Sequence, residues 1–252
     1  MATIGIMDSG VGGLSVFREI RKALPREHYI YYSDNANCPY GEKTPEFIRE
    51  RLRAITDFFI SKGAQAMVLA CNTATSAGIE TLREEYAIPF VGMEPAIKPA
   101  ALGTGSGVIG VLATKGTLKG DKYILNRERF AKDVKVVEQV GQGFVELVEA
   151  GIMEGPRAEA DAKAALKPLL DAGADRIVLG CTHYPFLIAT LRKVAASLGK
   201  PDTVFLDPAP AVARRLVSVL QEKGIGAGSA SPETELISSG DPAALQRMFA
   251  LI

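Results

Sequence analysis

Short runs of apolar residues alternate along the chain with longer segments in which apolar residues recur every three or four positions. Short apolar runs are typical of strands buried on both faces, and the longer pattern is typical of helices that cover a sheet. This alternation predicts an α/β protein with mainly parallel, doubly wound sheets. Strands are expected at residues 3–7, 28–33, 66–70, 90–92, 108–113, 134–137, 176–179 and 204–206, and in the segment TELISSG (234–240).

Helical periodicity fills the segments between these strands. In residues 45–62, for example, Ile48, Leu52, Ile55 and Phe59 fall on one side of a helix. Two prolines in GMEPAIKPA (92–100) are expected to break any helix there, since proline lacks the backbone N–H that a helix interior uses. Helices are expected at residues 11–24, 45–62, 74–86, 119–130, 143–150, 159–172 and 185–198, after the turn that opens DPAPAVARRL (207–216), and in DPAALQRMFALI (241–252).

Two segments of the chain are near-copies of each other. Residues 63–74 read GAQAMVLACNTA, and residues 173–184 read GADRIVLGCTHY, so that a strand ends in a loop with a cysteine at its tip each time. The openings IGIMDS (4–9) and IGVLAT (109–114) are also alike. The repetition indicates two related halves, the second starting near residue 97, although strand-to-loop endings in α/β proteins also look alike in general. Two halves that face each other would place two thiols on opposite sides of one pocket.

Composition excludes several classes of protein. The 252 residues contain 29 Lys plus Arg and 29 Asp plus Glu, which gives no excess charge to attract nucleic acid or an anionic membrane. No apolar run approaches the roughly 20 residues needed to span a bilayer, and MATIGIMDSG lacks the features of a signal peptide, so a cytoplasmic location is expected. Three cysteines without a CxxC pair, together with two histidines, argue against a disulfide framework and against a zinc site.

Polar side chains cluster where predicted strands end. In open α/β sheets, ligands bind beyond the carboxyl ends of the strands. Each of these segments precedes a predicted helix, whose N-terminal N–H groups can hold a carboxylate or stabilise a thiolate. The segments are Asp8-Ser9-Gly10, Cys71-Asn72-Thr73, Thr114 with Thr117, and Cys181-Thr182-His183.

The neighbours of the two repeated cysteines favour chemistry over a purely structural role. A cysteine is among the most buried residue types, so Cys71 by itself would more often be structural. Asn72, Thr73 and Thr75 add hydrogen-bonding groups that suit a substrate with carboxylates and an ammonium. His183 directly follows Thr182 and can polarise the Cys181 thiol or carry its proton.

Other candidate residues have weaker support. The glycines of DSGVGG (8–13) do not fit GxGxxG, and Asp8 would repel a phosphate. These glycines are therefore expected to form a tight turn that Asp8 caps or that brings Asp8 into the site.

Cys38 has no repeat partner and is expected to be structural. The hydroxyl of Tyr40 and the N–H of Gly41 could hold a carboxylate. In residues 143–150, Glu146 and Glu149 lie on neighbouring positions of one helix face, and either could be catalytic or merely solvated.

These observations leave three functions open. The duplicated thiol favours proton transfer at a carbon atom, in which one cysteine removes a proton from one face and the other donates to the opposite face. A hydrolase or amidotransferase would use one thiol as a nucleophile with a histidine and an aspartate, which leaves the second thiol unexplained. A binding module for amino acids would need neither thiol. Closed homodimers are the commonest soluble assembly, so a homodimer is expected.

At this point the sequence resembles a known family. DSGVGGLSV, YSDNANCPYGEK, VLACNTAT, GVLATKGT and LGCTHYP are similar, in order and spacing, to segments of the cofactor-independent glutamate racemases, part of the aspartate/glutamate racemase superfamily. The resemblance covers essentially the whole chain. Its aspartate-specific branch usually has an acidic residue where His183 stands, so the histidine favours glutamate over aspartate. The chain departs from the family at Asn37-Cys38, where many members have an Arg followed by an apolar residue.

The resemblance implies two flavodoxin-like α/β domains facing across a central cleft, formed by residues 1–96 plus 208–252 and by residues 97–207. It implies interconversion of L- and D-glutamate without pyridoxal phosphate, metal or any other cofactor, which supplies D-glutamate for peptidoglycan.

The resemblance also implies residue roles. Cys71 would take the α-proton of D-glutamate and Cys181 that of L-glutamate, with Asp8 and His183 as their respective helpers and Glu149 in an auxiliary role. The expected substrate contacts are Asp8, Ser9, Pro39, Tyr40, Gly41, Asn72, Thr73, Thr75, Thr114, Thr117, Thr182 and His183.

Overall fold

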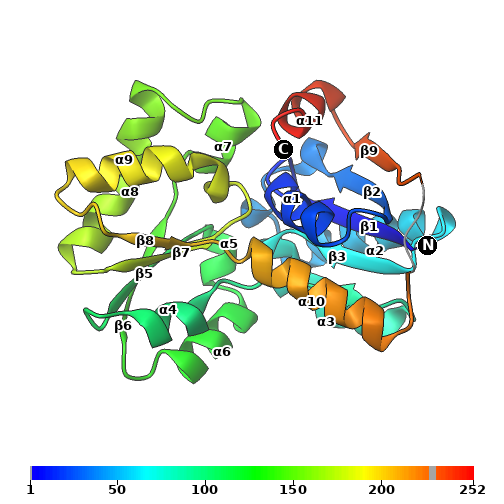
Figure 1. Cartoon of the computed structure of the whole chain (residues 1–252), viewed down its shortest axis with the longest axis horizontal. Coiled ribbons are helices and arrows are strands. Elements are labelled where there is room, and N and C mark those ends of the chain that lie inside the picture. Colours follow the sequence, from blue (N-terminus) through cyan, green and yellow to red (C-terminus); the bar gives the residue numbers. More distant parts are fainter. Residues whose placement is uncertain (1, 227–230) are drawn as a thin grey trace. The chain divides into compact units, whose positions relative to one another are not determined.

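Parallel strands form two separate sheets (Figure 1). A computed structural model describes residues 2–226 and 231–252. Contacts divide the chain into unit 1, Met1–Met93 with Ala209–Ile252, and unit 2, Glu94–Pro208. The division expected at 96/97 and 207/208 remains a prediction about independently folding domains.

The sheet of unit 1 has the strand order β4-β3-β1-β2-β9, and every neighbouring pair is parallel. Its central strands are buried, as their apolar runs predict, and β9 adds an edge strand from the C-terminal part of the chain. The strands are β1 (Thr3–Asp8), β2 (His28–Ser33), β3 (Ala66–Leu69), β4 (Phe90–Val91) and β9 (Thr234–Ser238).

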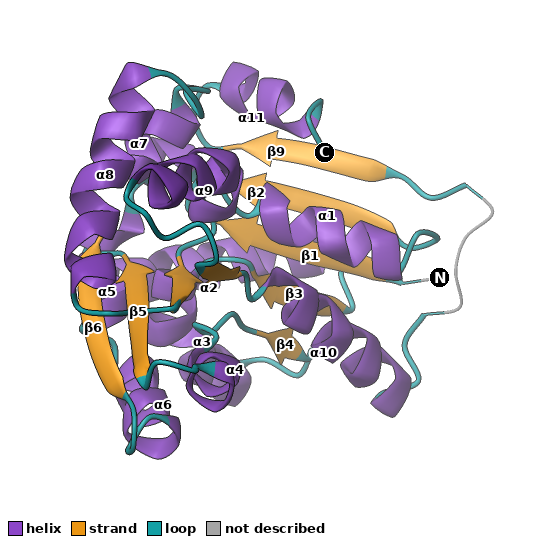
Figure 2. Cartoon of the chain, turned by 60° about the vertical axis from the view of Figure 1, so that its left-hand side comes forward, coloured by secondary structure: helices purple, strands orange, loops and turns teal. Residues whose placement is uncertain are grey.

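Helices cover both faces of this sheet. Helices α1 and α10 pack together on one face, and α2 and α3 pack together on the other (Figure 2). Leu52, Phe59 and Leu82 point from α2 and α3 into one cluster with the strand residues Met67 and Leu69. The helices of unit 1 are α1 (Leu14–Ala23), α2 (Pro45–Ser61), α3 (Asn72–Glu85), α10 (Ala209–Glu222) and α11 (Pro242–Phe249), with short 3-10 helices η1 (Asn35–Asn37) and η2 (Tyr40–Glu42) after β2.

The sheet of unit 2 has the order β6-β5-β7-β8 and is also parallel throughout. Helices α4 and α6 cover one face, and α8 and α9 cover the other (Figure 1). The strands are β5 (Val108–Ala113), β6 (Lys135–Val140), β7 (Arg176–Gly180) and β8 (Val204–Leu206). The helices are α4 (Ile97–Gly103), α5 (Lys115–Leu118), α6 (Asp121–Phe130), α7 (Phe144–Glu149), α8 (Pro156–Asp171) and α9 (Ile188–Ser197), with the 3-10 helix η3 (Tyr184–Leu187) before α9.

The two units share one topology. Taken in chain order, the fourth, third, first and second strands lie side by side in each unit, as β4-β3-β1-β2 and as β8-β7-β5-β6. Strands β1 and β5 are therefore equivalent, as are β3 and β7. The predicted α/β class with two related, parallel-stranded halves is confirmed.

Two helix predictions are wrong in detail. A helix does form where the two prolines were expected to prevent it, because α4 starts at Ile97 and Pro99 falls in its first turn, where a backbone N–H has no partner inside the helix. The helix expected at 185–198 starts as η3 and continues as α9. The helix expected at 119–130 is present as α6, and the short α5 before it was not predicted.

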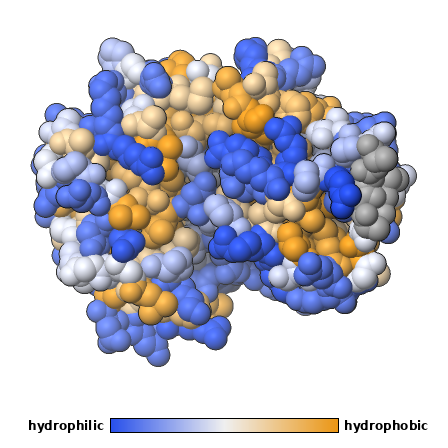
Figure 3. Space-filling model, viewed as in Figure 1, coloured by the Kyte–Doolittle hydropathy of each residue, from blue (hydrophilic) through white to orange (hydrophobic). Residues whose placement is uncertain are grey.

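Hydrophilic and hydrophobic residues are interspersed on the face shown in Figure 3. Within the described part of the chain, no helix is both long enough and apolar enough to cross a membrane. Among residues 2–226 and 231–252, the large hydrophobic side chains that reach the surface are Ile60, Leu102, Leu125, Val204 and Leu251.

Candidate functional site

Each unit has a point where neighbouring strands lead to helices on opposite faces of the sheet. In unit 1, β1 leads to α1 on one face, whereas the adjacent β3 leads to α3 on the other. The loops after these two strands therefore diverge, which is where open α/β sheets bind ligands. Asp8 ends β1 and Cys71 follows β3. In unit 2, Thr114 and Cys181 follow the equivalent strands β5 and β7.

The carboxylate of Asp8 lies inside the glycine-rich turn that follows it. Asp8 is fully buried, and its Oδ2 accepts hydrogen bonds from the N–H groups of Gly10 (3.2 Å) and Gly13 (2.9 Å). A side chain at position 13 would place its Cβ 2.6 Å from the Cβ of Asp8 and 2.7 Å from the hydroxyl of Tyr31, so only glycine fits there. The turn therefore binds its own carboxylate with the N–H groups that a phosphate loop would offer to a phosphate.

Cys71 is the N-terminal cap of α3. Its Sγ accepts a hydrogen bond from the N–H of Ala74 at 3.4 Å, and it lies 3.8 Å from the hydroxyl of Ser9. The first turn of a helix stabilises negative charge, so this position favours the thiolate form of the cysteine. The thiol side chain is nearly buried, with 5% of the residue exposed.

Some polar neighbours of Cys71 form hydrogen bonds within the protein, and others do not. Neither side-chain amide atom of the buried Asn72 has a hydrogen-bond partner among the described residues. A buried amide without a hydrogen-bond partner destabilises the folded state unless a ligand binds to it. The position of Asn72 therefore fits contact with a polar ligand. Ser9 and Thr73 are buried nearby. Thr75 differs from the expectation, because its hydroxyl donates to the carbonyl of Leu69 (3.3 Å) and accepts from the N–H of Met93 (3.0 Å), a structural role.

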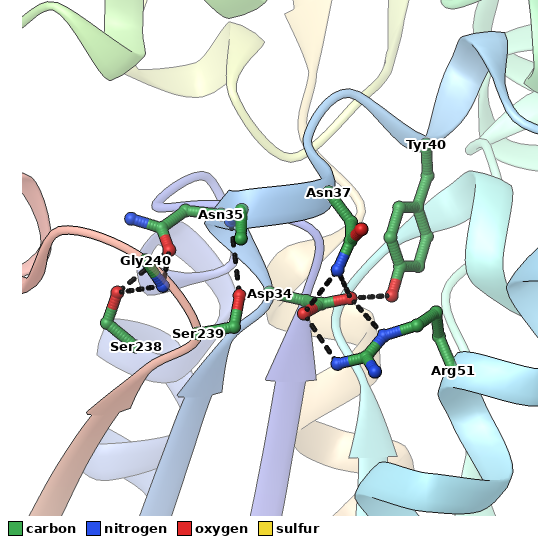
Figure 4. Close-up of polar contacts among 9 residues, drawn as sticks. Asp34, Asn35, Asn37, Tyr40, Arg51, Ser238, Ser239 and Gly240 are labelled. Carbon is green, nitrogen blue, oxygen red and sulfur yellow. Dashed lines mark hydrogen bonds and ion pairs between the residues drawn. The ribbon is translucent and has the colours of Figure 1, made fainter.

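The segment with Pro39, Tyr40 and Gly41 also differs from the expectation in one respect. The hydroxyl of Tyr40 donates to Oδ2 of the fully buried Asp34 at 2.6 Å, as Figure 4 shows. Its only proton is therefore not available to a substrate carboxylate. The ring of Tyr40 is buried in the hydrophobic core of unit 1, while Pro39 and Gly41 on either side are half-buried.

Asp34 is a residue of this region that was not predicted from the sequence pattern. It follows β2 directly, and its N–H donates to the carbonyl of Asp8 at 2.9 Å, so it lies at the same edge of the sheet as Asp8. An acidic residue at the carboxyl end of a predicted strand was the signal that could have identified it.

In unit 2, two threonines form the first turn of α5. The hydroxyl of Thr114 accepts the N–H of Thr117 at 3.2 Å and lies 3.0 Å from its hydroxyl. Thr117 is buried and Thr114 is partly exposed. Together they place two hydroxyls at the end of β5, next to the strand that leads to Cys181.

Cys181, His183 and Glu149 form a relay of side chains. Sγ of Cys181 lies 3.7 Å from Nδ1 of His183, whose Nε2 lies 2.7 Å from Oε1 of Glu149. Cys181 and His183 are buried, whereas Glu149 is partly exposed at the end of α7. A carboxylate on Nε2 orients the imidazole and stabilises its protonated form. The hydroxyl of Thr182 lies 3.4 Å from Nδ1.

This relay distinguishes the two acidic candidates of α7. Glu149 contacts His183, while Glu146, one turn earlier on the helix, is exposed. The order thiol, imidazole and carboxylate is also that of a cysteine hydrolase, so the geometry of unit 2 by itself suits either proton transfer or nucleophilic attack.

The surroundings of the two thiols differ. Cys71 caps an α-helix, whereas Cys181 is followed by the 3-10 helix η3 and lies beside an imidazole. Each cysteine therefore precedes a helix, as expected, but the helix after Cys71 is an α-helix and the one after Cys181 starts as a 3-10 helix. Backbone N–H groups lie next to one sulfur, and a histidine ring lies next to the other.

A second glycine-rich segment, GTGSG (103–107), also binds a carboxylate of the chain itself. Asp175 accepts hydrogen bonds from the hydroxyl of Thr104 (2.6 Å) and from the N–H groups of Gly105 (2.6 Å) and Ser106 (3.0 Å). This turn therefore resembles an anion site that a carboxylate of the chain itself fills.

Comparisons with known proteins find relatives that match the chain over most or all of its length. The family model for Asp/Glu/Hydantoin racemase matches residues 4–216. A glutamate racemase of Stutzerimonas stutzeri is 48% identical over 252 residues, which cover 100% of this chain and 94% of that protein.

Solved structures are similar over nearly the whole chain. The Escherichia coli glutamate racemase in complex with L-glutamate and the activator UDP-MurNAc-Ala has a TM-score of 0.87 and 38% identity, covering 98% of this chain and 95% of that chain. The Francisella tularensis glutamate racemase in complex with D-glutamate has a TM-score of 0.84 and 27% identity, covering 99% and 92%. This chain therefore belongs to the Asp/Glu/Hydantoin racemase family, among its glutamate racemases.

Proposed function

We propose that this protein interconverts L- and D-glutamate without a cofactor, with Cys71 and Cys181 as the two acid/base groups. The observation that carries the proposal is the duplicated thiol, which follows the equivalent strands β3 and β7 where each sheet sends its loops to opposite faces. A hydrolase needs one such thiol and a binding module needs none. The relatives at 38% and 48% identity support glutamate as the substrate.

In the proposed reaction, the two cysteines are the only groups that take up and release the α-proton. From D-glutamate, the Cys71 thiolate takes the α-proton, and the Cys181 thiol gives its proton to the opposite face of the resulting carbanion. L-glutamate leaves, with Cys71 now a thiol and Cys181 a thiolate, and the reverse reaction restores the first state. The two cysteines therefore titrate as one coupled system. The chemistry requires both sulfur atoms to reach one α-carbon.

Each thiol has its own helpers in the proposal. Asp8 and the N–H groups at the start of α3 serve the Cys71 side, and the relay of His183 and Glu149 serves the Cys181 side. Asn72, with both amide atoms unused by the described residues, is proposed to bind the substrate, as are Ser9, Thr73, Thr114, Thr117 and Thr182. Hydrogen bonds placed where charge develops stabilise the carbanion in the absence of an electron sink.

The primary test is incubation with L-glutamate in D₂O without added cofactor. Loss of optical rotation together with deuterium at the α-carbon supports the proposal, and retention of the α-proton contradicts it. Cys71→Ser and Cys181→Ser are each expected to lower kcat for racemisation by roughly 10²–10⁴-fold, the usual contribution of an acid/base group.

A glutamate analogue with chloride on the β-carbon distinguishes the roles of the two thiols. Its elimination needs only one base, because chloride leaves as the α-proton is taken, and the enamine formed hydrolyses to 2-oxoglutarate and ammonium. Cys181→Ser should still eliminate from the D-configured analogue, and Cys71→Ser from the L-configured one. A covalent acyl-enzyme found by mass spectrometry on one cysteine, with the other dispensable, would instead identify a hydrolase.

We also propose that the protein acts as a homodimer in the cytoplasm, where D-glutamate enters peptidoglycan synthesis. Closed dimers are the commonest assembly of soluble proteins. Sedimentation equilibrium should give about twice the 26.8 kDa of one chain, and a mass equal to one chain would contradict the dimer.

A further inference from the structure

The buried carboxylate of Asp34 is the centre of a hydrogen-bond network that ties four segments of unit 1 together (Figure 4). Arg51 of α2 pairs with it through two bonds, Nε to Oδ2 at 3.0 Å and Nη2 to Oδ1 at 2.9 Å. Asn37 of η1 donates its amide to both oxygens at 3.1 and 3.2 Å, and Tyr40 of η2 donates its hydroxyl at 2.6 Å. Asn37 is one of the two residues at which the chain departs from the family pattern.

The network keeps Asp34 charged and Tyr40 neutral. Burial by itself raises the pKa of Asp34, but hydrogen bonds from Arg51, Tyr40, Ser239 and Asn37 outweigh it and hold the pKa below its usual value. Burial raises the pKa of Tyr40 far above its usual value, and the hydrogen bond to Asp34 raises it further. The hydroxyl proton therefore stays on Tyr40 and points to Asp34.

A turn from the C-terminal part of the chain holds the other side of the same loop. Oδ1 of Asn35 accepts the N–H of Gly240 and the hydroxyl of Ser238, each at 2.8 Å, while its amide donates to the carbonyl of Asp241 at 2.9 Å. The N–H of Ala36 donates to the hydroxyl of Ser239 at 3.1 Å (Figure 4). This turn lies beyond residue 216, where the match to the family model ends.

The geometry points to Asp34 as a positioning residue. Resting on the proposed function, we infer that its charge fixes the ring of Tyr40, and with it the backbone of residues 39–41, which belongs to the substrate contacts expected from the sequence. The inference differs from a direct role of the Tyr40 hydroxyl in binding, because that hydroxyl acts only through Asp34. Loss of uniform binding raises KM and leaves kcat unchanged.

A double-mutant cycle in racemisation kinetics tests this inference. Asp34→Asn keeps the shape and removes the charge, and it is expected to raise KM for glutamate roughly ten- to hundredfold, the range for a hydrogen bond to a charged group, with kcat within about twofold of wild type. Tyr40→Phe should raise KM in the wild-type background but have no further effect in Asp34→Asn. Equal effects of Tyr40→Phe in both backgrounds would overturn the inference, since the hydroxyl would then contact the substrate itself.

Two arginines of α2 provide a matched control. Arg51→Gln breaks the paired bonds to Asp34, whereas Arg53→Gln breaks an equally bidentate pair with Glu85, both bonds 2.7 Å, on the surface. Arg51→Gln should raise KM and Arg53→Gln should not, while Arg51→Lys should restore part of the loss. A kcat that falls with KM unchanged in Arg51→Gln would also overturn the inference.

A measurement independent of turnover separates this inference from the proposed function. Hydrogen exchange of the amides in residues 38–43 should be faster in Asp34→Asn and Arg51→Gln than in wild type and Arg53→Gln. Unchanged exchange in Asp34→Asn, with a native thermal transition, would contradict the positioning role. If the wild type does not racemise glutamate, the proposed function fails, and the exchange data alone still decide whether Asp34 positions the loop.

Discussion

At the scale of single residues, the two thiols differ in what surrounds the sulfur. Sγ of Cys71 accepts a backbone N–H at the start of α3. Sγ of Cys181 lies beside His183, whose Nε2 is 2.7 Å from the carboxylate of Glu149. A substitution of Glu149 therefore changes the surroundings of one thiol and leaves the hydrogen bond of the other in place.

Glu149→Gln is expected to lower kcat roughly ten- to hundredfold, because a charge-assisted hydrogen bond to His183 is lost. Glu146→Gln on the same helix is the control, since Glu146 is exposed and should have little effect. The measurement is steady-state racemisation followed by circular dichroism in both directions. Similar losses from both substitutions would show that the charge of α7, and not the contact with His183, matters.

At the scale of elements, the sequence pattern located most strands and helices, since burial on both faces and helical periodicity are local properties. The two thiols and their polar neighbours were located for the same reason, as strand endings are visible in the pattern. What the pattern missed depends on specific pairings of side chains and strands, from 6 residues apart for Tyr40 and Asp34 to some 200 for β9 and β2. The partner of Tyr40 is Asp34, the partner of Thr75 is Met93, and β9 pairs with β2 across some 200 residues. None of these pairings leaves a periodic signal.

Helix α3 offers a prediction at this scale. Because the sulfur of Cys71 caps the helix, Cys71→Ala should lower the free energy of unfolding by about 1 kcal/mol, whereas serine can take over the cap and Cys71→Ser should cost less. Chemical denaturation of both variants measures the difference. Equal stability of the alanine and serine variants would mean that the contact with Ala74 does not stabilise the helix.

At the scale of the whole molecule, the two units are not equivalent in their connectivity. Unit 2 is one continuous stretch of chain, and unit 1 is completed by α10, β9 and α11. Helix α1 packs against α10, and β2 needs β9 as a neighbour, so residues 1–93 by themselves lack part of their core and one strand of their sheet.

A fragment of residues 94–208 is therefore expected to fold alone, with a cooperative thermal transition in circular dichroism, and to lack racemase activity. A fragment of residues 1–93 should show no such transition. The opposite result, with the first fragment unfolded and the second folded, would place the boundaries of the folding domains elsewhere.

The position of β9 has a consequence for how the protein is made. On the ribosome, β2 is synthesised early, but its neighbour at the sheet edge is translated only after all of unit 2. At the usual pace of translation this interval is on the order of ten seconds. During that time the nascent chain carries an unpaired strand edge, at which other chains can pair and aggregate.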